Sequence, residues 1–442
     1  PPALQAAVEV PTMQNGKIEV HEVTRVEGHG NIILNVKEGK IEELRLDITE
    51  SPRFFEAMLV GRNWYEATHL TCRICGICSI GHSSASINAL ENGLGVEPSE
   101  LTMRLRRVCH AGETLQSHVL HVYFLAAPDL LGVPSVFPLV ETHTDVVKRA
   151  LKLKRLANDI CGTLVGRHIH PCSMRIKAFP KLPSKESLAA LRDRIVAAVP
   201  DLQATVDLVA TLPLPAFERE TEYVSLYHPG EYAMYGGQII RSSTGPDTPL
   251  YDYLDKVQEY VVPHSLSKHV HSETGGAYMV GALARFNNNH AQLRPEALAA
   301  AETMGLRPPC YNPYMNSVAQ VVECVHVALE TVNELNALLD MDFVEEDGEV
   351  AVKACRCVGA SEVPRGILFH EYNLDDDGYI TSANLIIPTG QNLNNLEQDM
   401  HSLVPQILEQ EPENIRQALE MLVRAYDPCI SCATHLLEVK FV

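Results

Sequence analysis

The chain has 442 residues, of which 46% are hydrophobic and 21% charged, so it can bury a large core and is not of the intrinsically disordered class. Its 36 basic and 56 acidic residues give a formal net charge of −20, which argues against nucleic acid or an anionic membrane surface as a partner. Twelve cysteines are too sparse for a disulfide scaffold in a chain of this length. With no visible secretory signal, we expect a soluble, cytoplasmic protein.

The first 50 residues are expected to form a β region. Residues 17–48 alternate apolar and polar positions around a turn at Glu38-Gly39-Lys40, a pattern typical of an antiparallel sheet. The most hydrophobic stretch, residues 119–140, contains Asp129 and three prolines. It therefore fits a buried helix followed by a turn better than a membrane span.

Helical periodicity dominates the rest of the chain. It predicts helices over residues 83–94, 101–125, 142–163, 185–212, 250–261, 295–302 and 318–339. Residues 213–246, rich in Pro, Gly and Tyr, are interpreted as a surface excursion or a domain edge. A second hairpin is expected over residues 367–387, turning at Asp377-Gly378, because the Asp375–Asp377 run lacks the spaced ligands of a calcium loop.

Together these elements predict one α+β domain over residues 1–442. It is mainly helical, with a central helical bundle and small antiparallel β elements near the N-terminus and before the C-terminal motif.

Two Cys-x-x-Cys pairs carry the strongest chemical signal. Cys75 and Cys78 lie in "TCRICGIC", and Cys429 and Cys432 lie in "DPCISC" near the other end of the chain. Local zinc sites usually close within about 15–20 residues. A far longer loop costs only about 0.6 kcal/mol more per doubling of its length, so the separation does not forbid a shared site. Spacing alone leaves three readings open, namely a catalytic metal, a structural zinc or unrelated thiols.

Five motifs, in order, narrow these readings. They are "RVEGHG" (25–30), "RICGICSIGH" (73–82), "SHVLHVYFL" (117–125), "VPRGILFH" (363–370) and "DPCISCATH" (427–435). Over nearly the whole chain they resemble the large subunit of nickel–iron hydrogenases.

The resemblance implies a metal centre. Cys75 and Cys429 would bind nickel terminally, and Cys78 and Cys432 would bridge it to an iron with two cyanides and one carbon monoxide. Four thiolates, two cyanides and two divalent metals sum to about −2, a charge that needs positive neighbours in a buried site. By resemblance, Arg365 lies above the open metal position, Pro388 and Thr389 face a cyanide, and His82 packs against a bridging cysteine.

The reaction that the resemblance implies is reversible heterolytic cleavage of dihydrogen. Cys429 would be the first proton acceptor and Glu27 the outward relay, with Arg365 as a rival first base. A second ion, magnesium or iron, would bind Glu56, the Leu385 carbonyl and His435. Ile77 and Leu125 match positions that narrow the family's gas channel, although on pattern alone both are ordinary core residues.

Several positions depart from the family or stay outside its motifs. Ser117 replaces an aspartate that some members place beside Arg365, so we expect a more loosely paired arginine. The short tail after His435 is interpreted as an uncleaved end that packs as a strand. His118 and His121 are either supporting groups or satisfied core histidines. The remaining cysteines are interpreted as packing residues: Cys72, Cys109, Cys161, Cys172, Cys310, Cys324, Cys355 and Cys357.

The chain offers no ligands for an electron-carrying cluster, so the resemblance implies a partner, the iron–sulfur small subunit. Further flavin or iron–sulfur subunits would pass electrons to a nicotinamide, a deazaflavin, or a ferredoxin or heterodisulfide-linked module, and maturation proteins would insert the metals. Two other classes are weighed against this reading. One is a structural subunit with a zinc tetrathiolate, and the other is the quinone-binding subunit of respiratory complex I, which lacks the cysteine ligands.

Overall fold

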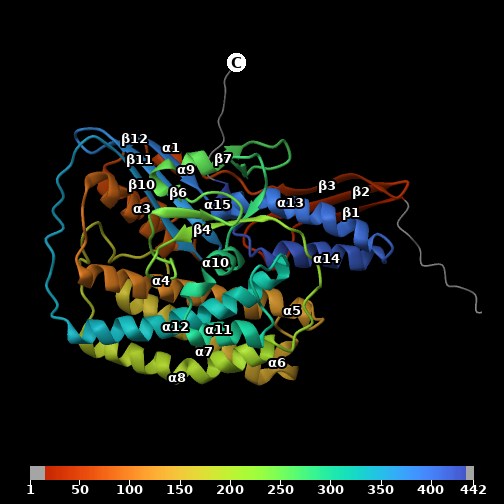
Figure 1. Cartoon of the computed structure of the whole chain (residues 1–442), viewed down its shortest axis with the longest axis horizontal. Coiled ribbons are helices and arrows are strands. Elements are labelled where there is room, and N and C mark those ends of the chain that lie inside the picture. Colours follow the sequence, from red (N-terminus) through yellow and green to blue (C-terminus); the bar gives the residue numbers. More distant parts are fainter. Residues whose placement is uncertain (1–14, 435–442) are drawn as a thin grey trace, which may run out of the picture.

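The computed structural model describes residues 15–434, and its lower half is a layer of long helices (Figure 1). Helix α4 (Glu100–Leu120) packs between α7 (Thr144–Val165) and α12 (Asn316–Asp340), and α12 packs in turn on α8 (Lys185–Val209). The buried side chains of α8 recur at helical spacing: Leu188, Leu191, Ile195, Ala198, Leu202 and Val206. These helices confirm the bundle expected from periodicity.

A three-stranded antiparallel sheet lies above this layer. It consists of β10 (Cys355–Val363), β11 (Gly366–Leu374) and β12 (Ile380–Ile386). Strands β11 and β12 confirm the second predicted hairpin, whereas β10 is an element that the sequence pattern did not reveal. Helix α3 (Ser79–Leu94) packs directly on β10. Gly359 permits this contact, because a Cβ there would stand 2.1 Å from the backbone nitrogen of Ala89.

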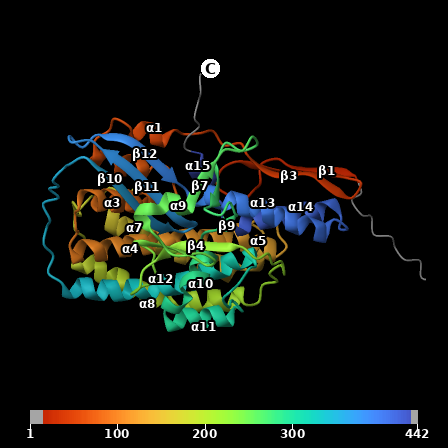
Figure 2. The ribbon, with the colours of Figure 1, turned by 45° about the horizontal axis from the view of Figure 1, so that its top comes forward.

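The N-terminal β region is a meander of β1 (Gly16–Val20), β2 (Gly30–Lys37) and β3 (Lys40–Ile48). Its second turn is at residues 38–40, as expected. Helices α13 (Pro388–Ile407) and α14 (Pro412–Ala425) lie against this sheet, so segments from the early and the late parts of the described chain pack together (Figures 1 and 2). The sequence pattern missed α13 because its first turns bury the polar residues Gln391, Asn392 and Asn395, which hide the apolar stripe.

The middle of the chain holds two small sheets. One has the order β6-β5-β4-β9, with β4 (Glu222–Tyr227), β5 (Ile239–Ser242), β6 (Thr248–Pro249) and β9 (Tyr278–Met279). The other pairs β7 (Val257–Tyr260) with β8 (His269–Ser272). The helix expected over residues 250–261 is therefore wrong in its second half. Only a short turn and α9 (Tyr253–Lys256) are helical there, because the following residues bond to β8 instead.

Residues 213–246, interpreted as a surface excursion or a domain edge, contain one strand that is largely buried. The four central residues of β4 are buried between β5 and β9, since this strand carries part of a second core cluster. The assignment of the whole chain to one domain stays a prediction.

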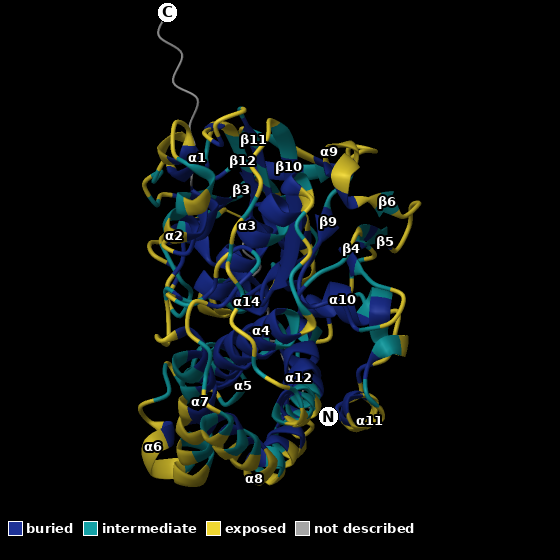
Figure 3. Ribbon diagram, turned by 90° about the vertical axis from the view of Figure 1, so that its left-hand side faces the viewer, coloured by how far each residue is buried: buried dark blue, intermediate teal, exposed yellow. Residues whose placement is uncertain are grey.

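Shorter helices complete the described chain. They are α1 (Phe55–Leu59), α2 (Ala67–Thr71), α5 (Ala127–Leu130), α6 (Leu139–Thr142), α10 (Ala282–Asn289), α11 (Pro295–Thr303) and α15 (Ile430–Ala433). Buried residues fill the interior between the layers, and exposed ones line the outer faces of α6, α7 and α8 (Figure 3). No helix within residues 15–434 is long and apolar enough to cross a membrane. His435 and the tail after it lie outside the described residues.

Candidate metal centre

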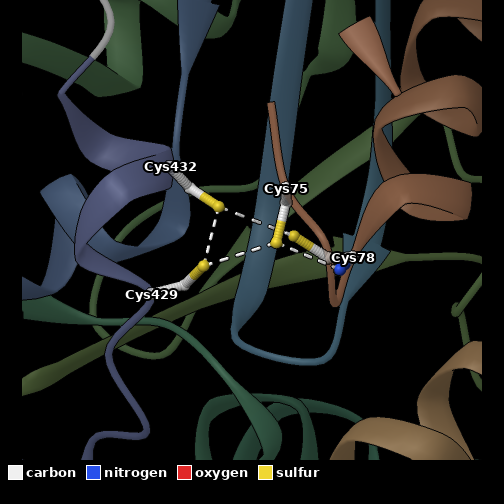
Figure 4. A group of neighbouring side chains, drawn as sticks. All are labelled: Cys75, Cys78, Cys429 and Cys432. Carbon is white, nitrogen blue, oxygen red and sulfur yellow. Dashed lines mark hydrogen bonds between the residues drawn. The ribbon is translucent and has the colours of Figure 1, made fainter. Parts of the chain in front are cut away.

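The two cysteine pairs meet in the interior. The four sulfurs lie within 4.8 Å of one another, and all four residues are buried (Figure 4). The Sγ atoms are 3.4 Å apart for Cys75 and Cys429, 3.9 Å for Cys78 and Cys432, and 2.7 Å for Cys429 and Cys432. Each pair is thus matched with the pair from the other end of the chain, as a shared metal site requires.

Backbone amides prepare one of these sulfurs for metal binding. The N–H groups of Ile77 and Cys78 donate to Cys75 Sγ at 3.2 and 3.1 Å. Burial opposes ionisation of Cys75, but hydrogen bonds from the other thiols and the charge of Arg365 lower its pKa well below the usual value. Hydrogen bonds from the second pair lower the pKa of Cys78, but Cys75 and burial outweigh them and raise it to about 11. One thiolate therefore forms readily, and the others need a cation.

The donor set fits the implied metals. Four convergent sulfurs are soft ligands suited to nickel, iron or zinc, and no hard oxygen donor is required to complete the set. A cation among them would replace sulfur–sulfur hydrogen bonds with bonds to the metal. We conclude that the folded chain can hold a thiolate-bound metal here.

Glu27 contacts the C-terminal motif directly. Its Oε2 lies 3.1 Å from Cys429 Sγ and accepts from the Ser431 amide at 3.2 Å, while the Ser431 hydroxyl donates to Oε1. The backbone is fixed as well, because the Ile430 amide donates to the Glu27 carbonyl at 2.9 Å. Gly28, with a φ of +87°, allows this approach, since a Cβ there would stand 2.7 Å from Ile430 Cβ.

Arg365 is buried beside the sulfurs and is tightly paired. Its Nη2 donates to Asp427 Oδ1 at 2.8 Å, and its Nε donates to the Asp427 carbonyl at 2.6 Å. Ser117 Oγ is only a third, longer contact at 3.3 Å. The expectation of a loosely held arginine is therefore wrong, because Asp427 supplies the carboxylate that Ser117 lacks.

Two other predicted groups lie at the centre's edges. Thr389, in the first turn of α13 after Pro388, accepts from the Cys429 amide at 3.0 Å through its hydroxyl oxygen. His82 is buried on α3, and its Nδ1 lies 3.2 Å from Nε2 of His370. His82 thus has a histidine as one neighbour, and its contact with a bridging cysteine stays a prediction.

Two residues predicted for the second ion site lie side by side. Glu56 is buried, and its carboxylate accepts from the Leu385 amide at 2.7 Å. The two residues come from α1 and β12, far apart in the sequence, and the role of the Leu385 carbonyl as an ion ligand stays a prediction. The third member, His435, lies outside the described residues.

Comparison with known proteins agrees with this centre. The family model described as "Nickel-dependent hydrogenase" matches residues 53–159 and 268–435, and one described as "HoxL-like" matches residues 17–51. The alpha subunit of sulfhydrogenase 1 from Pyrococcus furiosus is 33% identical over 424 residues, which cover 96% of this chain and 98% of that protein. The chain belongs to the nickel-dependent hydrogenase family.

Two further hydrogenases match nearly the whole chain. The F420-non-reducing hydrogenase of Methanothermobacter marburgensis has a subunit that is 29% identical, and the match covers 96% of this chain and 95% of that protein. The crystal structure of an NAD+-reducing [NiFe]-hydrogenase in the H2-reduced state superposes with a TM-score of 0.85 at 28% identity, covering 96% of this chain and all of that one. These matches favour the hydrogenase over the two other classes, the structural zinc subunit or the complex I subunit.

Three residues of the hydrogenase centre had no sequence prediction as site residues. The Arg53 guanidinium donates to the carbonyls of Ile74 and Ser431, and so joins the two cysteine segments. Ser431 holds Glu27, and Glu113 accepts from the amides of Ile80 and Gly81 at 2.5 and 2.8 Å, which fixes the start of α3. The only available signal was for Ser431, which stands inside the second cysteine motif.

His118 and His121 are both buried, and each contacts a polar side chain of α12. The Nδ1 of His121 lies 2.5 Å from Gln320 Oε1, and Gln320 donates to Asp427, the residue that holds Arg365.

His118 Nε2 lies 2.7 Å from Glu323, which Arg285 also binds through two nitrogens at 2.6 and 2.7 Å. Arg285 additionally donates to Glu362 at 2.8 Å. We call Arg285, Glu323 and Glu362 the buried ion network.

Proposed function

We propose that this hydrogenase large subunit catalyses reversible heterolytic cleavage of dihydrogen at a nickel–iron centre held by Cys75, Cys78, Cys429 and Cys432. By analogy with the family, the iron carries two cyanides and one carbon monoxide. The observation that carries the proposal is the convergence of four buried sulfurs from opposite ends of the chain. When bound, the metal pair supplies a Lewis-acidic site for dihydrogen and a store for its electrons.

Cys429 and Glu27 would move the proton. Cys429 Sγ is within reach of Glu27 Oε2 at 3.1 Å, so a proton on the sulfur has an adjacent acceptor. The Ser431 amide and hydroxyl hold both carboxylate oxygens of Glu27 in place. Glu27 is half-buried, and proton release toward solvent therefore starts from a group at the border of the core.

Arg365 would act through its charge and not as the first base. Burial disfavours that charge, but Asp427 and the cysteine sulfurs raise the pKa of Arg365 further above its usual value, so it stays a cation. Its guanidinium offsets part of the negative charge of four thiolates and two cyanides.

Thr389 and Pro388 would line the cyanide side. Because the Thr389 oxygen already accepts from the Cys429 amide, its O–H proton remains available to donate to a cyanide nitrogen. Pro388 adds an apolar wall without an N–H group. Glu56, the Leu385 carbonyl and His435 are proposed to bind the magnesium or iron ion, and His82 is proposed to pack against a bridging cysteine.

Electrons would leave through a small subunit with iron–sulfur clusters and then through further electron-transfer subunits, in a cytoplasmic complex. The similar proteins are named as subunits of hydrogenases, with sulfhydrogenase, F420-non-reducing and NAD+-reducing activities in their names. A nicotinamide, a deazaflavin, and a ferredoxin or heterodisulfide module are the candidate acceptors, and reduction assays with each partner complex separate them. Maturation proteins would deliver the metals.

Infrared spectroscopy and metal analysis test the centre. We expect cyanide and carbon monoxide stretching bands, with nickel and iron in similar amounts from this subunit. Zinc alone, without such bands, would refute the proposal.

Glu27→Gln tests the proton route. Gln keeps an acceptor oxygen for Ser431 but cannot take up a proton, so metal content and infrared bands should be retained while exchange between deuterium gas and water protons drops steeply. Ser431→Ala is the matched control that loosens Glu27 without removing its carboxylate. Wild-type exchange in Glu27→Gln would remove Glu27 as the relay.

A further inference from the structure

A second group of metal-ligand side chains lies away from the four sulfurs. His264, His269 and Glu397 each offer one ligand atom, and these atoms lie within 4.8 Å of one another. They come from the loop after β7, from the first residue of β8 and from the middle of α13. We propose that these three side chains bind a divalent cation of the zinc type.

Hydrogen bonds within the described chain do not account for the placement of His269. Within the described chain, buried His269 has no hydrogen-bond partner at Nε2, and its Nδ1 stands 3.9 Å from Glu397 Oε2, beyond hydrogen-bond distance. A buried ring with no hydrogen bond is costly unless another partner binds it. A cation between His269 and Glu397 is a partner of the right chemistry.

The remaining ligands are already oriented. Glu397 Oε1 accepts from the Leu46 amide at 3.0 Å and lies 2.8 Å from His264 Nε2, so the carboxylate is fixed while Oε2 stays available. Hydrogen bonds of this kind to a ligating carboxylate are typical of metal sites. His264 is 23% exposed, which leaves an opening for a water ligand on the solvent side.

The ligand types select the ion. Two imidazoles and one carboxylate favour zinc or another first-row metal over magnesium or calcium. Lys268, which precedes His269 in the chain, does not oppose a cation, because it is paired with Glu259 at 2.7 Å. The site thus differs from the sulfur centre in donor type as well as in position.

A bound ion would join three separate segments. Through Glu397 it would fasten α13 to the β7–β8 pair, and the Leu46 amide extends the connection to β3. The first turn of α13 holds Thr389 against Cys429, so the ion would stabilise the element that positions one side of the catalytic centre.

Zinc binding by the purified hydrogenase, with its sulfur centre filled, tests the proposal. After incubation with zinc and removal of excess, we expect one zinc per chain more in the wild type than in Glu397→Gln or His264→Gln, with affinity reduced about 100-fold in the variants. Gln at 397 keeps an acceptor for the Leu46 amide. His271→Gln is the matched control, because it removes a histidine from the same strand outside the group.

Cobalt(II) absorption gives a second measurement. A band from nitrogen and oxygen ligation should develop on the wild type and on His271→Gln, and added zinc should displace it. Equal zinc content in wild type and Glu397→Gln, or no cobalt band on the wild type, would overturn the proposal. Unchanged infrared bands and nickel content in each variant show that the fold is intact.

Discussion

The buried ion network and the four-cysteine centre both place negatively charged groups in the interior of the molecule, but these groups depend on different partners. Arg285 donates to both Glu323 and Glu362 through hydrogen bonds of 2.6–2.8 Å, so these buried carboxyl groups share a cation supplied by the folded chain. The four sulfurs have Arg365 as a nearby cation, but Asp427 already engages it. The carboxyl groups of the buried ion network are paired with a cationic side chain. The four sulfurs, which are soft donors, need metal ions to complete their site.

The largest expected effect is at the sulfur centre. Cys429→Ala removes one nickel ligand and the first proton acceptor, so hydrogenase activity and nickel content should fall below detection. The free energy of unfolding of the metal-free chain should change by only about 1 kcal/mol, because the loss is one small side chain. Metal analysis and chemical denaturation measure the two effects. Retained nickel would show that the centre is completed differently.

A substitution in the buried ion network should have a large effect on stability, in contrast to the substitution at the sulfur centre. Arg285→Met removes the guanidinium that pairs with two buried carboxyl groups, those of Glu323 and Glu362, and should lower the free energy of unfolding by about 3–5 kcal/mol even without metal. Arg416→Met is the control, since Arg416 also pairs with two glutamates, Glu413 and Glu420, but is 42% exposed. Its effect should stay within about 1 kcal/mol. Equal losses in both variants would contradict the role of burial.

Replacing the centre's cation by a different one sharpens the comparison. Arg365→Lys keeps the charge but loses the planar donor pair that engages Asp427 Oδ1 and the Asp427 carbonyl. We expect a fall of about 10–100-fold in kcat with nickel retained. Hydrogen-uptake kinetics beside nickel analysis test this, and wild-type kcat would show that charge alone suffices.

Glu113, near the sulfur centre, and Glu362, in the buried ion network, are acids with raised pKa values, and their effect on stability is the smallest that we expect. Burial, only partly offset by hydrogen bonds from two amides, raises the pKa of Glu113 to about 8, and burial against the pull of Arg285 raises the pKa of Glu362 to about 7. Each carboxyl group binds its proton more tightly in the folded chain than in the unfolded chain. Its contribution to the free energy of unfolding is therefore complete below about pH 4.5 and is lost as the pH rises through the folded pKa.

Denaturation of the metal-free chain at several pH values separates the two acids. Between pH 7 and 8 most of the remaining decline belongs to Glu113, because Glu362 is already about half ionised at pH 7, and Glu113→Gln should reduce the decline by on the order of 1 kcal/mol. An unchanged decline in Glu113→Gln would show that another group titrates there.

The sequence predicted those features that depend on the spacing of residues close together in the chain. The long helices follow from apolar spacing, and the cysteine pairs follow from ligand spacing and the motifs around them. The partners that hold the site were not predictable in this way, because Asp427 with Arg365 and Arg53 with Ser431 meet only after distant segments fold together. The helix α13 was missed for a related reason, since its buried amides serve contacts that periodicity does not encode.

The backbone connection between Glu27 and Cys429 has a consequence for biosynthesis. The N-terminal strand region and the first cysteine pair leave the ribosome long before the second pair exists. At about 5–20 residues per second, the intervening chain takes roughly 20–70 s to synthesise. During that interval the second cysteine pair is missing from the centre, and Glu27 has no partner strand. Closure of the centre therefore waits until the segment that carries Cys429 and Cys432 has been made.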